Sequence, residues 1–353
     1  MRKGKRLIAW IMAVVMLFTI CVFGGNGTAE AAATTPVAKH GRLSVKGADL
    51  VDSKENKFQL RGISTHGINW DVGSPYVNKK AFKTLRDDWG VNAIRLAMYT
   101  EEYNGYCSGG SQAKLRKLVD KGVGYATDLG MYAIIDWHIL SDGNPNKNKS
   151  QAKKFFTTMA KKYKNNKNVI YEICNEPNGC SWKEIKSYAT DIIKTIRKYD
   201  KKAVIIVGTP TWSQLGTDGT SNEVADSPIK GYKNIMYSLH FYASEWAHNE
   251  YLPAKVAYAR KKKLPIIVSE FGLSPASGDG AINKASADKW MKLLNKYNIS
   301  YFCWSLSNKN ESASLLKPST KKTSGWKSGD LSTAGKYIKK KYLARKKALG
   351  KKA

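Results

Sequence analysis

Residues 169–196 read VIYEICNEPNGCSWKEIKSYATDIIKTI, and this stretch decides the fold because it contains one strand, one loop and one helix. The apolar run at 169–174 is rich in β-branched and aromatic residues, as in strands buried on both faces. Apolar residues then recur every three or four positions from Trp182 to Ile196, and Ser181 with Glu184 forms a capping box before them. The stretch therefore predicts one β-strand followed by one α-helix.

The same unit recurs along the chain. Seven further apolar runs lie at 58–64, 93–98, 132–137, 203–207, 235–240, 265–269 and 300–304. Successive runs end 29 to 39 residues apart, which leaves room for a crossover helix between parallel strands. Eight such units predict a single α/β domain with the architecture of a (β/α)8 TIM barrel. An open doubly wound sheet is the alternative, but no glycine-rich phosphate turn follows the first run.

The segments around the barrel predict an exported chain. Residues 1–31 have a basic start, a long apolar run and the small-residue pattern Ala29-Glu30-Ala31, as in a cleaved signal peptide. An uncleaved membrane anchor is the alternative, because the apolar run approaches the length that spans a bilayer. We expect a linker at 32–40, a barrel domain at 41–343 that begins with a short hairpin, and a basic tail at 344–353. The protein would then be secreted and extracellular, and we expect a monomer.

The composition is that of a folded and very basic protein. Hydrophobic residues make up 42% of the chain, which excludes disorder, and Lys plus Arg outnumber Asp plus Glu by 59 to 28. Loss of residues 1–31 would leave 55 basic and 27 acidic residues, a net charge of +28. Such a charge favours binding to anionic polymers, including nucleic acid. The lysines are spread over predicted helix faces, however, so we expect no specific nucleic-acid partner and no membrane partner after cleavage.

Four cysteines would remain after cleavage, at positions 107, 174, 180 and 303. They match no zinc-binding spacing, and export permits disulfides. Cys174 and Cys180 are close enough in sequence to form a bridge, but four cysteines allow three complete pairings. The sequence does not choose among them.

Polar residues gather where the predicted strands end, which is where a barrel of this kind carries its reactive groups. These residues are His66, Arg95, His138, Asn175, Glu176, His240 and Glu270, with Trp304 ending the last run. Two carboxylates at strand ends are costly to bury unless they have partners or a use. A pair of carboxylates in an aromatic-lined cleft is what glycoside hydrolysis requires, one protonated and one ionised. The sequence therefore predicts a glycoside-cleaving site.

Several motifs in order strengthen this prediction. They are ICNEP at 173–177, HFY at 240–242, VSEFG at 268–272 and CWSLS at 303–307, together with LRGISTHGINW at 60–70, NAIRLAMY at 92–99, TPTWSQ at 209–214 and KNE at 309–311. Residues 40–342 resemble glycoside hydrolase family 5 through these motifs, and in particular its secreted bacterial endo-β-1,4-glucanases. The resemblance implies hydrolysis of internal bonds in β-1,4-glucan with retention of configuration, and it requires neither a cofactor nor a metal.

The resemblance also implies roles for individual residues. Glu270 would be the nucleophile and Glu176 the acid and base, while Arg95 and Tyr242 would keep Glu270 ionised and aimed. Asn175 would bond the 2-hydroxyl of the sugar under attack, as is usual in such transition states. The remaining implied substrate contacts are His138, His240 and Trp304 around the cleavage point, His66, Trp70, Lys309 and Glu311 on the non-reducing side, Trp212 on the leaving side, and Tyr99 in the cleft wall.

Some alternatives stay open at this point. Another β-glycanase, such as a mannanase or a xyloglucanase, would share the reacting residues and differ only in the outer subsites. A catalytically silent polysaccharide-binding barrel would not need both carboxylates. Asp71 follows Trp70 where an aromatic residue is common in the family, which weakens the predicted distal platform. We expect Asp136 to face a neighbouring strand or loop, and His40 and His248 to serve packing or the surface.

Overall fold

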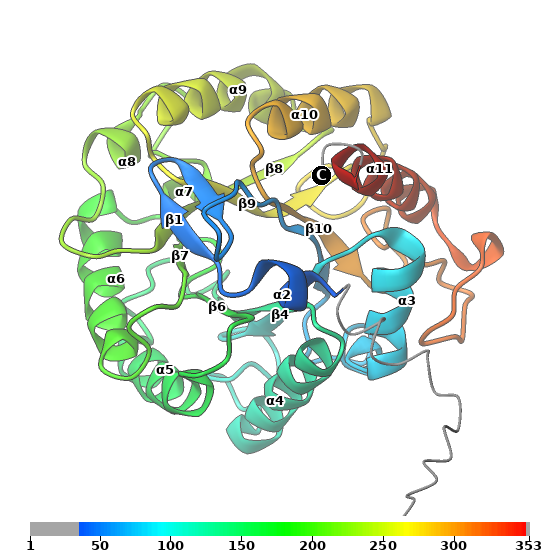
Figure 1. The fold of residues 1–353 in the computed structure, drawn as a ribbon, viewed down its shortest axis with the longest axis horizontal. Helices are drawn as coiled ribbons and strands as arrows, with labels where there is room; N and C mark the ends of the chain where they lie inside the picture. Colours follow the sequence, from blue (N-terminus) through cyan, green and yellow to red (C-terminus); the bar gives the residue numbers. More distant parts are fainter. Residues whose placement is uncertain (1–34, 351–353) are drawn as a thin grey trace, which may run out of the picture.

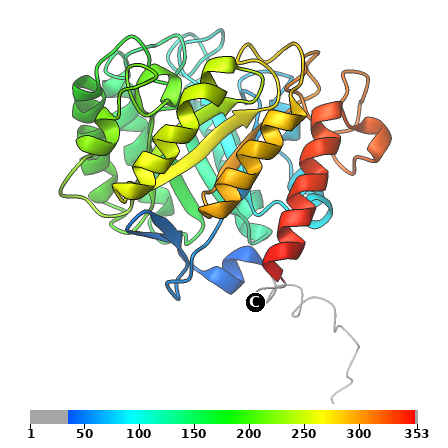
Figure 2. The same ribbon diagram turned by 90° about the horizontal axis from the view of Figure 1, so that it is seen from above.

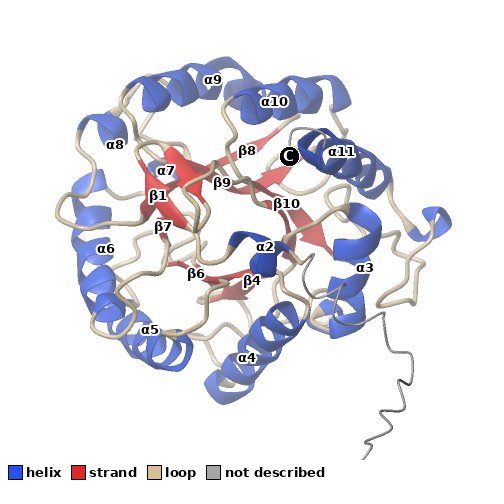
Figure 3. Ribbon diagram, viewed as in Figure 1, coloured by secondary structure: helices blue, strands red, loops and turns tan. Residues whose placement is uncertain are grey.

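The computed structural model describes residues 35–350, so the predicted signal peptide lies outside the described residues. Eight parallel strands form a closed barrel in the order β10-β3-β4-β5-β6-β7-β8-β9, with helices around it (Figures 1 and 3). The predicted TIM barrel is thereby confirmed. The barrel strands are β3 Arg61–Thr65, β4 Ala93–Tyr99, β5 Tyr132–His138, β6 Val169–Glu172, β7 Ile205–Val207, β8 Ile235–Tyr242, β9 Ile266–Gly272 and β10 Tyr301–Leu306.

Long helices cover the outside of the barrel. They are α3 Lys79–Trp89, α4 Gln112–Asp128, α5 Lys149–Tyr163, α6 Trp182–Arg197, α9 Trp246–Lys261, α10 Lys284–Lys296 and α11 Thr333–Gly350. The short elements are α2 Pro36–His40, α7 Pro210–Ser213, α8 Glu223–Asp226 and the 3-10 helices η1 Ser74–Tyr76 and η2 Ser328–Asp330. None of the helices in residues 35–350 combines the length and hydropathy needed to span a membrane.

A hairpin of β1 Ser44–Lys46 and β2 Asp49–Val51 closes the amino-terminal end of the barrel, as expected. Leu43, Leu50 and Phe58 pack there against the lower interior of the barrel. Figure 2 shows the hairpin and α2 at one end of the barrel, while the long loops gather at the other. The hairpin therefore seals the end that lies away from the carboxyl ends of the strands.

Two segments differ from the sequence-based prediction. The expected linker at 32–40 contains helix α2, which is anchored because the Val37 amide donates to the Gly130 carbonyl at 2.9 Å. The expected basic tail at 344–353 is mostly the end of α11. This helix extends to Gly350 because the buried Tyr342 hydroxyl donates to the Gly62 carbonyl at 2.9 Å and Arg345 Nε donates to Gln59 at 2.8 Å.

The side chains inside the barrel change from apolar to polar toward the carboxyl ends of the strands. Alternate residues of one strand point inward, so Tyr132, Ile134, Asp136 and His138 of β5 follow one another up the interior. Tyr132 and Ile134 belong to the lower apolar cluster, whereas Asp136 and His138 hydrogen-bond to each other above it. The fold therefore places an apolar base beneath a layer of buried charge.

Candidate active site

A cleft of about 590 Å³ opens at the carboxyl ends of the barrel strands. Twelve of the fourteen residues predicted for the site line it: His66, Trp70, Tyr99, His138, Glu176, Trp212, His240, Tyr242, Glu270, Trp304, Lys309 and Glu311. Arg95 and Asn175 lie buried beneath it, and both hydrogen-bond to groups of the site. The barrel thus brings together residues that are widely separated in sequence.

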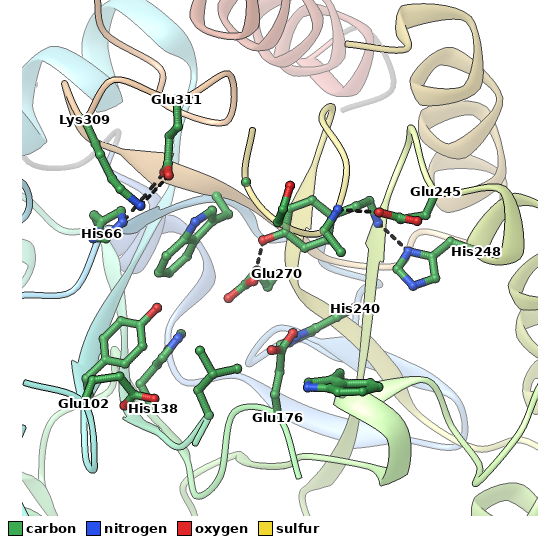
Figure 4. A pocket seen from close by; sticks show the side chains of 18 of the residues that line it. His66, Glu102, His138, Glu176, His240, Glu245, His248, Glu270, Lys309 and Glu311 are labelled. Carbon is green, nitrogen blue, oxygen red and sulfur yellow. Dashed lines mark hydrogen bonds and ion pairs between the residues drawn. The ribbon is translucent and has the colours of Figure 1, made fainter. Parts of the chain in front are cut away.

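Glu176 and Glu270 face each other across this cleft (Figure 4). An oxygen of each carboxyl group and Nδ1 or Nε2 of His240 lie within 4.8 Å of one another. Glu270 lies within β9, and Glu176 follows β6 in the next loop. The Glu176 side chain is 13% exposed and the Glu270 side chain 5%, so each is reachable from the cleft although largely removed from water.

Two donors orient Glu270. Arg95 Nη1 donates to Oε2 at 2.9 Å, and the Tyr242 hydroxyl donates to Oε1 at 2.8 Å. Burial and the neighbouring carboxylates raise the pKa of Tyr242 well above its ordinary value, so this hydroxyl keeps its proton and remains a donor. Both oxygens of Glu270 are therefore fixed, as a carboxylate that must attack from one direction requires.

The environment of Glu176 favours its protonated form. Burial raises its pKa to about 8, with the carboxyl groups of Asp136 and Glu172 adding to the rise and Arg95 opposing it. His240 Nδ1 lies 2.8 Å from Oε1 of Glu176. Burial also lowers the pKa of His240 to about 4, so the imidazole is neutral at neutral pH. The two facing glutamates therefore occupy different environments, which suits different tasks.

Arg95 is the centre of the buried charge beneath the cleft. Its guanidinium has five N–H groups, and it donates hydrogen bonds to four side chains. They are Glu172 at 2.7 Å, Glu270 at 2.9 Å, Ser64 at 3.4 Å and Asn175 at 2.5 Å. Asp136 forms an ion pair with the guanidinium at 3.1 Å. Burial alone would lower the pKa of Arg95, but the three carboxylates raise it above its ordinary value. The arginine is thus permanently charged and fully engaged.

Arg95 also fixes the proton position on a neighbouring imidazole. Because Asn175 Oδ1 accepts from Arg95, its Nδ2 must face the Ile139 carbonyl at 3.1 Å and His138 Nε2 at 3.2 Å. His138 Nε2 is therefore an acceptor, and its proton sits on Nδ1, which donates to Asp136 at 2.6 Å. Burial lowers the pKa of His138 to about 3, consistent with a neutral ring. One network thus sets the orientation of both residues.

Comparisons with known proteins agree with this geometry. The family model for cellulase (glycosyl hydrolase family 5) matches residues 51–310. An endoglucanase of Clostridium saccharobutylicum is 47% identical over 95% of this chain and 72% of its own length, and endoglucanase A of Butyrivibrio fibrisolvens is 45% identical over 85% and 68%. The catalytic domain of Thermobifida fusca endoglucanase Cel5A, solved with cellotetraose, matches with a TM-score of 0.81 at 36% identity, covering 88% of this chain and 99% of that domain.

The chain belongs to glycosyl hydrolase family 5. The family resemblance predicted from the motifs is thereby confirmed, and the barrel found here is the fold of the solved family members that it matches.

Aromatic rings form much of the wall of this family 5 cleft. Trp304 stacks on His138 with centroids 5.3 Å apart, and Tyr99 lies 4.1 Å from the same imidazole. Trp70 packs 4.5 Å from Tyr99, and its Nε1 donates to the Tyr103 carbonyl at 2.7 Å. Trp70 lines the cleft, and the residue after it, Asp71, is exposed.

Trp212 occupies the opposite wall on a strained turn. Thr211, Trp212 and Ser213 have φ values of 56°, 53° and 64°, which residues with a Cβ rarely adopt. The loop after β6 supports this turn, because the Trp212 amide donates to the Pro177 carbonyl at 3.0 Å and the Ser213 hydroxyl to the Asn175 carbonyl at 2.7 Å. Trp212 is 44% exposed, so its indole is available as a wall of the cleft.

His66, Lys309 and Glu311 form a polar group at one side of the cleft, away from Glu245 and His248 in Figure 4. Lys309 Nζ lies 2.5 Å from Glu311 Oε2, and His66 Nε2 lies 3.7 Å from Glu311 Oε1. The Gly67 amide donates to His66 Nδ1 at 2.8 Å, so the ring carries its proton on Nε2, toward Glu311. Three of the four residues predicted for the non-reducing side of the substrate are therefore neighbours.

Some residues of the site were not predicted from the sequence. Glu102, Glu245 and His248 line the cleft from loops or helices. His248 was assigned to packing or the surface, and it does accept from the Tyr242 amide at 2.9 Å while also reaching the cleft. Asp136 forms an ion pair with Arg95 of the neighbouring strand β4, so it faces a neighbouring strand as expected. The contact lies inside the barrel. Glu172 was overlooked, although an acidic residue two positions after Ile170 in an apolar run is a signal for an inward carboxylate.

The side chains of Glu176, His240 and Glu270 are also of the kind that bind divalent metals. The oxygens of Glu270 already accept from Arg95 and Tyr242, and His240 Nδ1 already contacts Glu176. The arrangement is thus accounted for by protein partners. The four described cysteines are all unpaired, so none of the three disulfide pairings is present in residues 35–350.

Proposed function

We propose that the protein is an endo-β-1,4-glucanase that hydrolyses internal bonds of cellulose and related β-glucans with retention of anomeric configuration. The main support is the pair of glutamate carboxyls with oxygens within 4.8 Å of each other. Retaining enzymes keep the two carboxyl groups about 5 to 5.5 Å apart, whereas inverting enzymes leave room for a water between acid and sugar. The relatives named endoglucanase support the same reaction and the same class of substrate.

In the first step, an oxygen of Glu270 attacks the anomeric carbon and the bond to the leaving oxygen breaks. Glu176 gives its proton to that oxygen, so the departing chain leaves as a neutral alcohol. Arg95 and Tyr242 aim the attacking carboxylate. The family resemblance assigns the 2-hydroxyl of the sugar to Asn175, which lies buried directly beneath the cleft. The products of this step are a glucosyl ester on Glu270 and an ionised Glu176.

In the second step, Glu176 takes a proton from water, and the oxygen of that water attacks the anomeric carbon. The ester bond breaks and Glu270 leaves as a carboxylate, which returns both glutamates to their starting states. His240 Nδ1 lies 2.8 Å from Glu176 Oε1, so with its proton on Nδ1 the imidazole would stabilise the ionised carboxylate between the steps. Two inversions at the same carbon give net retention.

The aromatic walls support a glucan chain as the substrate. Indole and phenol rings offer flat apolar faces to sugar rings, and Trp70, Trp304 and Trp212 line the same cleft as the two glutamates. We place the non-reducing part of the chain near His66, Lys309 and Glu311, and the leaving part near Trp212. This follows the roles implied by the family resemblance.

Substrate choice is tested with purified protein on carboxymethyl-cellulose and on mannan. We expect reducing ends from the first polymer and few from the second, and the reverse order would favour a mannanase. Glu270→Gln should abolish hydrolysis while leaving glycan binding intact. Glu245→Gln is a matched control, because it removes a carboxylate that also lines the cleft but lies away from the reacting pair (Figure 4).

We also propose that the protein acts outside the cell as a monomer. The signal-like sequence of residues 1–31 supports export, and a polymeric substrate that cannot cross the membrane makes an extracellular site useful. Amino-terminal sequencing of secreted protein should find a start near residue 32. A start at residue 1 in the membrane fraction would instead support a retained anchor.

A further inference from the structure

The excess positive charge of the chain has no use in cleaving a neutral glucan. The catalytic cleft itself has the opposite character, because it is lined by five glutamates and only one lysine. The cleft glutamates are Glu102, Glu176, Glu245, Glu270 and Glu311. If the cations behind the net charge of +31 form a binding site together, that site must lie on another part of the surface.

A second hollow of about 650 Å³ lies at the opposite end of the barrel. Its walls come from residues around the β1–β2 hairpin, from the segment between α5 and β6, and from the segment between α6 and β7. Five cations line it, namely Arg42, Lys164, Lys167, Lys201 and Lys202, together with a single acidic residue, Asp200. The hollow is therefore strongly positive.

Asp200 joins the three segments around this hollow. It is 2% exposed, and its Oδ1 accepts from the amides of Lys202 at 3.1 Å and Ala203 at 2.9 Å. Its Oδ2 lies 3.8 Å from Arg42 Nη1, and Arg42 Nη2 donates to the Lys164 carbonyl at 3.3 Å. The backbone is thus fixed around the hollow, and the one carboxylate is already matched by the one arginine.

The four lysines are left without an acidic partner. Among residues 35–350, no carboxylate oxygen lies within 4.0 Å of the Nζ atoms of Lys164, Lys167, Lys201 or Lys202, and all four side chains are exposed. In the same part of the chain, Arg42 Nη1 is buried with no hydrogen-bond partner. Like charges gathered in one hollow repel one another, and an anion bound between them would relieve that repulsion.

We propose that this hollow binds an anion with several closely spaced phosphate groups, such as a phosphate chain. Phosphate offers several acceptor oxygens and more charge per group than a carboxylate, which suits four lysines on two segments. Arg42 is already held by Asp200 and the Lys164 carbonyl, so it adds fixed positive charge to the hollow while the lysines supply the free donors. The hollow faces away from the catalytic cleft, so an occupied site would leave the cleft open to glucan.

Isothermal titration with inorganic tripolyphosphate in 150 mM salt tests this proposal. We expect wild-type protein to bind, and the fourfold variant with Lys164, Lys167, Lys201 and Lys202 changed to Gln to bind roughly a hundredfold more weakly. The matched control changes the exposed lysines Lys114, Lys117, Lys121 and Lys154 to Gln, which gives the same net charge. This control should bind as tightly as wild type.

Equal weakening in both variants would overturn the proposal, because it would show a response to net charge alone. Absence of wild-type binding at millimolar tripolyphosphate would overturn it as well. A second titration with long-chain polyphosphate distinguishes a site for a short, free anion from a site for a phosphate polymer. Tighter binding per molecule than tripolyphosphate is expected only if the hollow admits the longer chain. Hydrolysis of a soluble cello-oligosaccharide should be unchanged in both variants, which distinguishes failure of this site from failure of the proposed reaction.

Discussion

Arg95 illustrates how a single residue organises this site. Its guanidinium hydrogen-bonds to four side chains, among them Glu270 and Asn175, and forms an ion pair with Asp136. Lysine has the same charge but only one nitrogen, so it cannot reach acceptors on several sides at once. Arg95 therefore has a geometric task as well as an electrostatic one.

Arg95→Lys should thus impair both folding and catalysis. It leaves buried carboxylates without partners, and we expect the free energy of unfolding to fall by about 3 to 5 kcal/mol, as when one member of a buried ion pair is lost. Urea unfolding would measure this loss. Unchanged stability together with unchanged turnover would contradict this role, because it would show that the Arg95 network tolerates the loss of the guanidinium.

Glu176→Ala should remove general acid and base catalysis. We expect turnover of carboxymethyl-cellulose to fall about 100-fold to 10,000-fold. An aryl cellobioside whose leaving group needs no proton should still release its aryl alcohol in a rapid burst, because only the second step then lacks its base. Added azide should restore turnover by replacing the activated water. Equal loss of the burst and of polymer hydrolysis would contradict the assigned role.

The pH dependence follows from the raised pKa of Glu176. The acid must be protonated, so kcat/KM should fall as the pH rises above the pKa of Glu176, with the alkaline limb near pH 8. The charge of Glu172 contributes to this rise, so Glu172→Gln should move the limb to lower pH while the amide oxygen still accepts from Arg95. A limb that stays in place would mean that Glu172 acts only through packing.

At the scale of elements, the site is predictable where it depends on strand ends. Parallel strands of a barrel all end on one side, so Arg95, His138, His240 and Glu270 could be grouped from their places in apolar runs. Residues on long loops, such as Glu102 and Glu245, could not be placed, because loop conformation depends on contacts that have no period in the sequence. Helix α2 was missed because five residues carry too little pattern to distinguish it from a linker.

Helix α6 offers a test of how local signals contribute to the fold. Ser181 Oγ accepts from the Glu184 amide, and Glu184 reaches back to the Ser181 amide at 2.9 Å, so the capping box predicted from sequence is present. Ser181→Ala should lower the free energy of unfolding by about 1 kcal/mol and leave kcat unchanged. Lys183→Ala is the control on an exposed position of the same turn, and calorimetry of both variants measures the difference.

At the scale of the whole molecule, the barrel separates its two ends. The hairpin and the apolar lower interior close the amino-terminal end, while the opposite end carries buried charge beneath an open cleft. Strands β3 and β10 pack so closely that residue 62 must be glycine. A Cβ on Gly62 would lie 1.9 Å from the ring of Phe302. The overall charge is the feature that neither the fold nor the reaction explains, and only the arrangement of the cations in space gives it a possible use.

The stereochemistry of the reaction tests the central claim most directly, because it depends on how the two facing glutamates divide the work. Proton NMR should follow the anomeric signals of the first product released from a defined cello-oligosaccharide, before mutarotation equilibrates them. With retention, the β-anomer should form first and the α-anomer should appear later. Initial formation of the α-anomer would mean a single displacement by water, and the roles given to residues 176 and 270 would then be wrong.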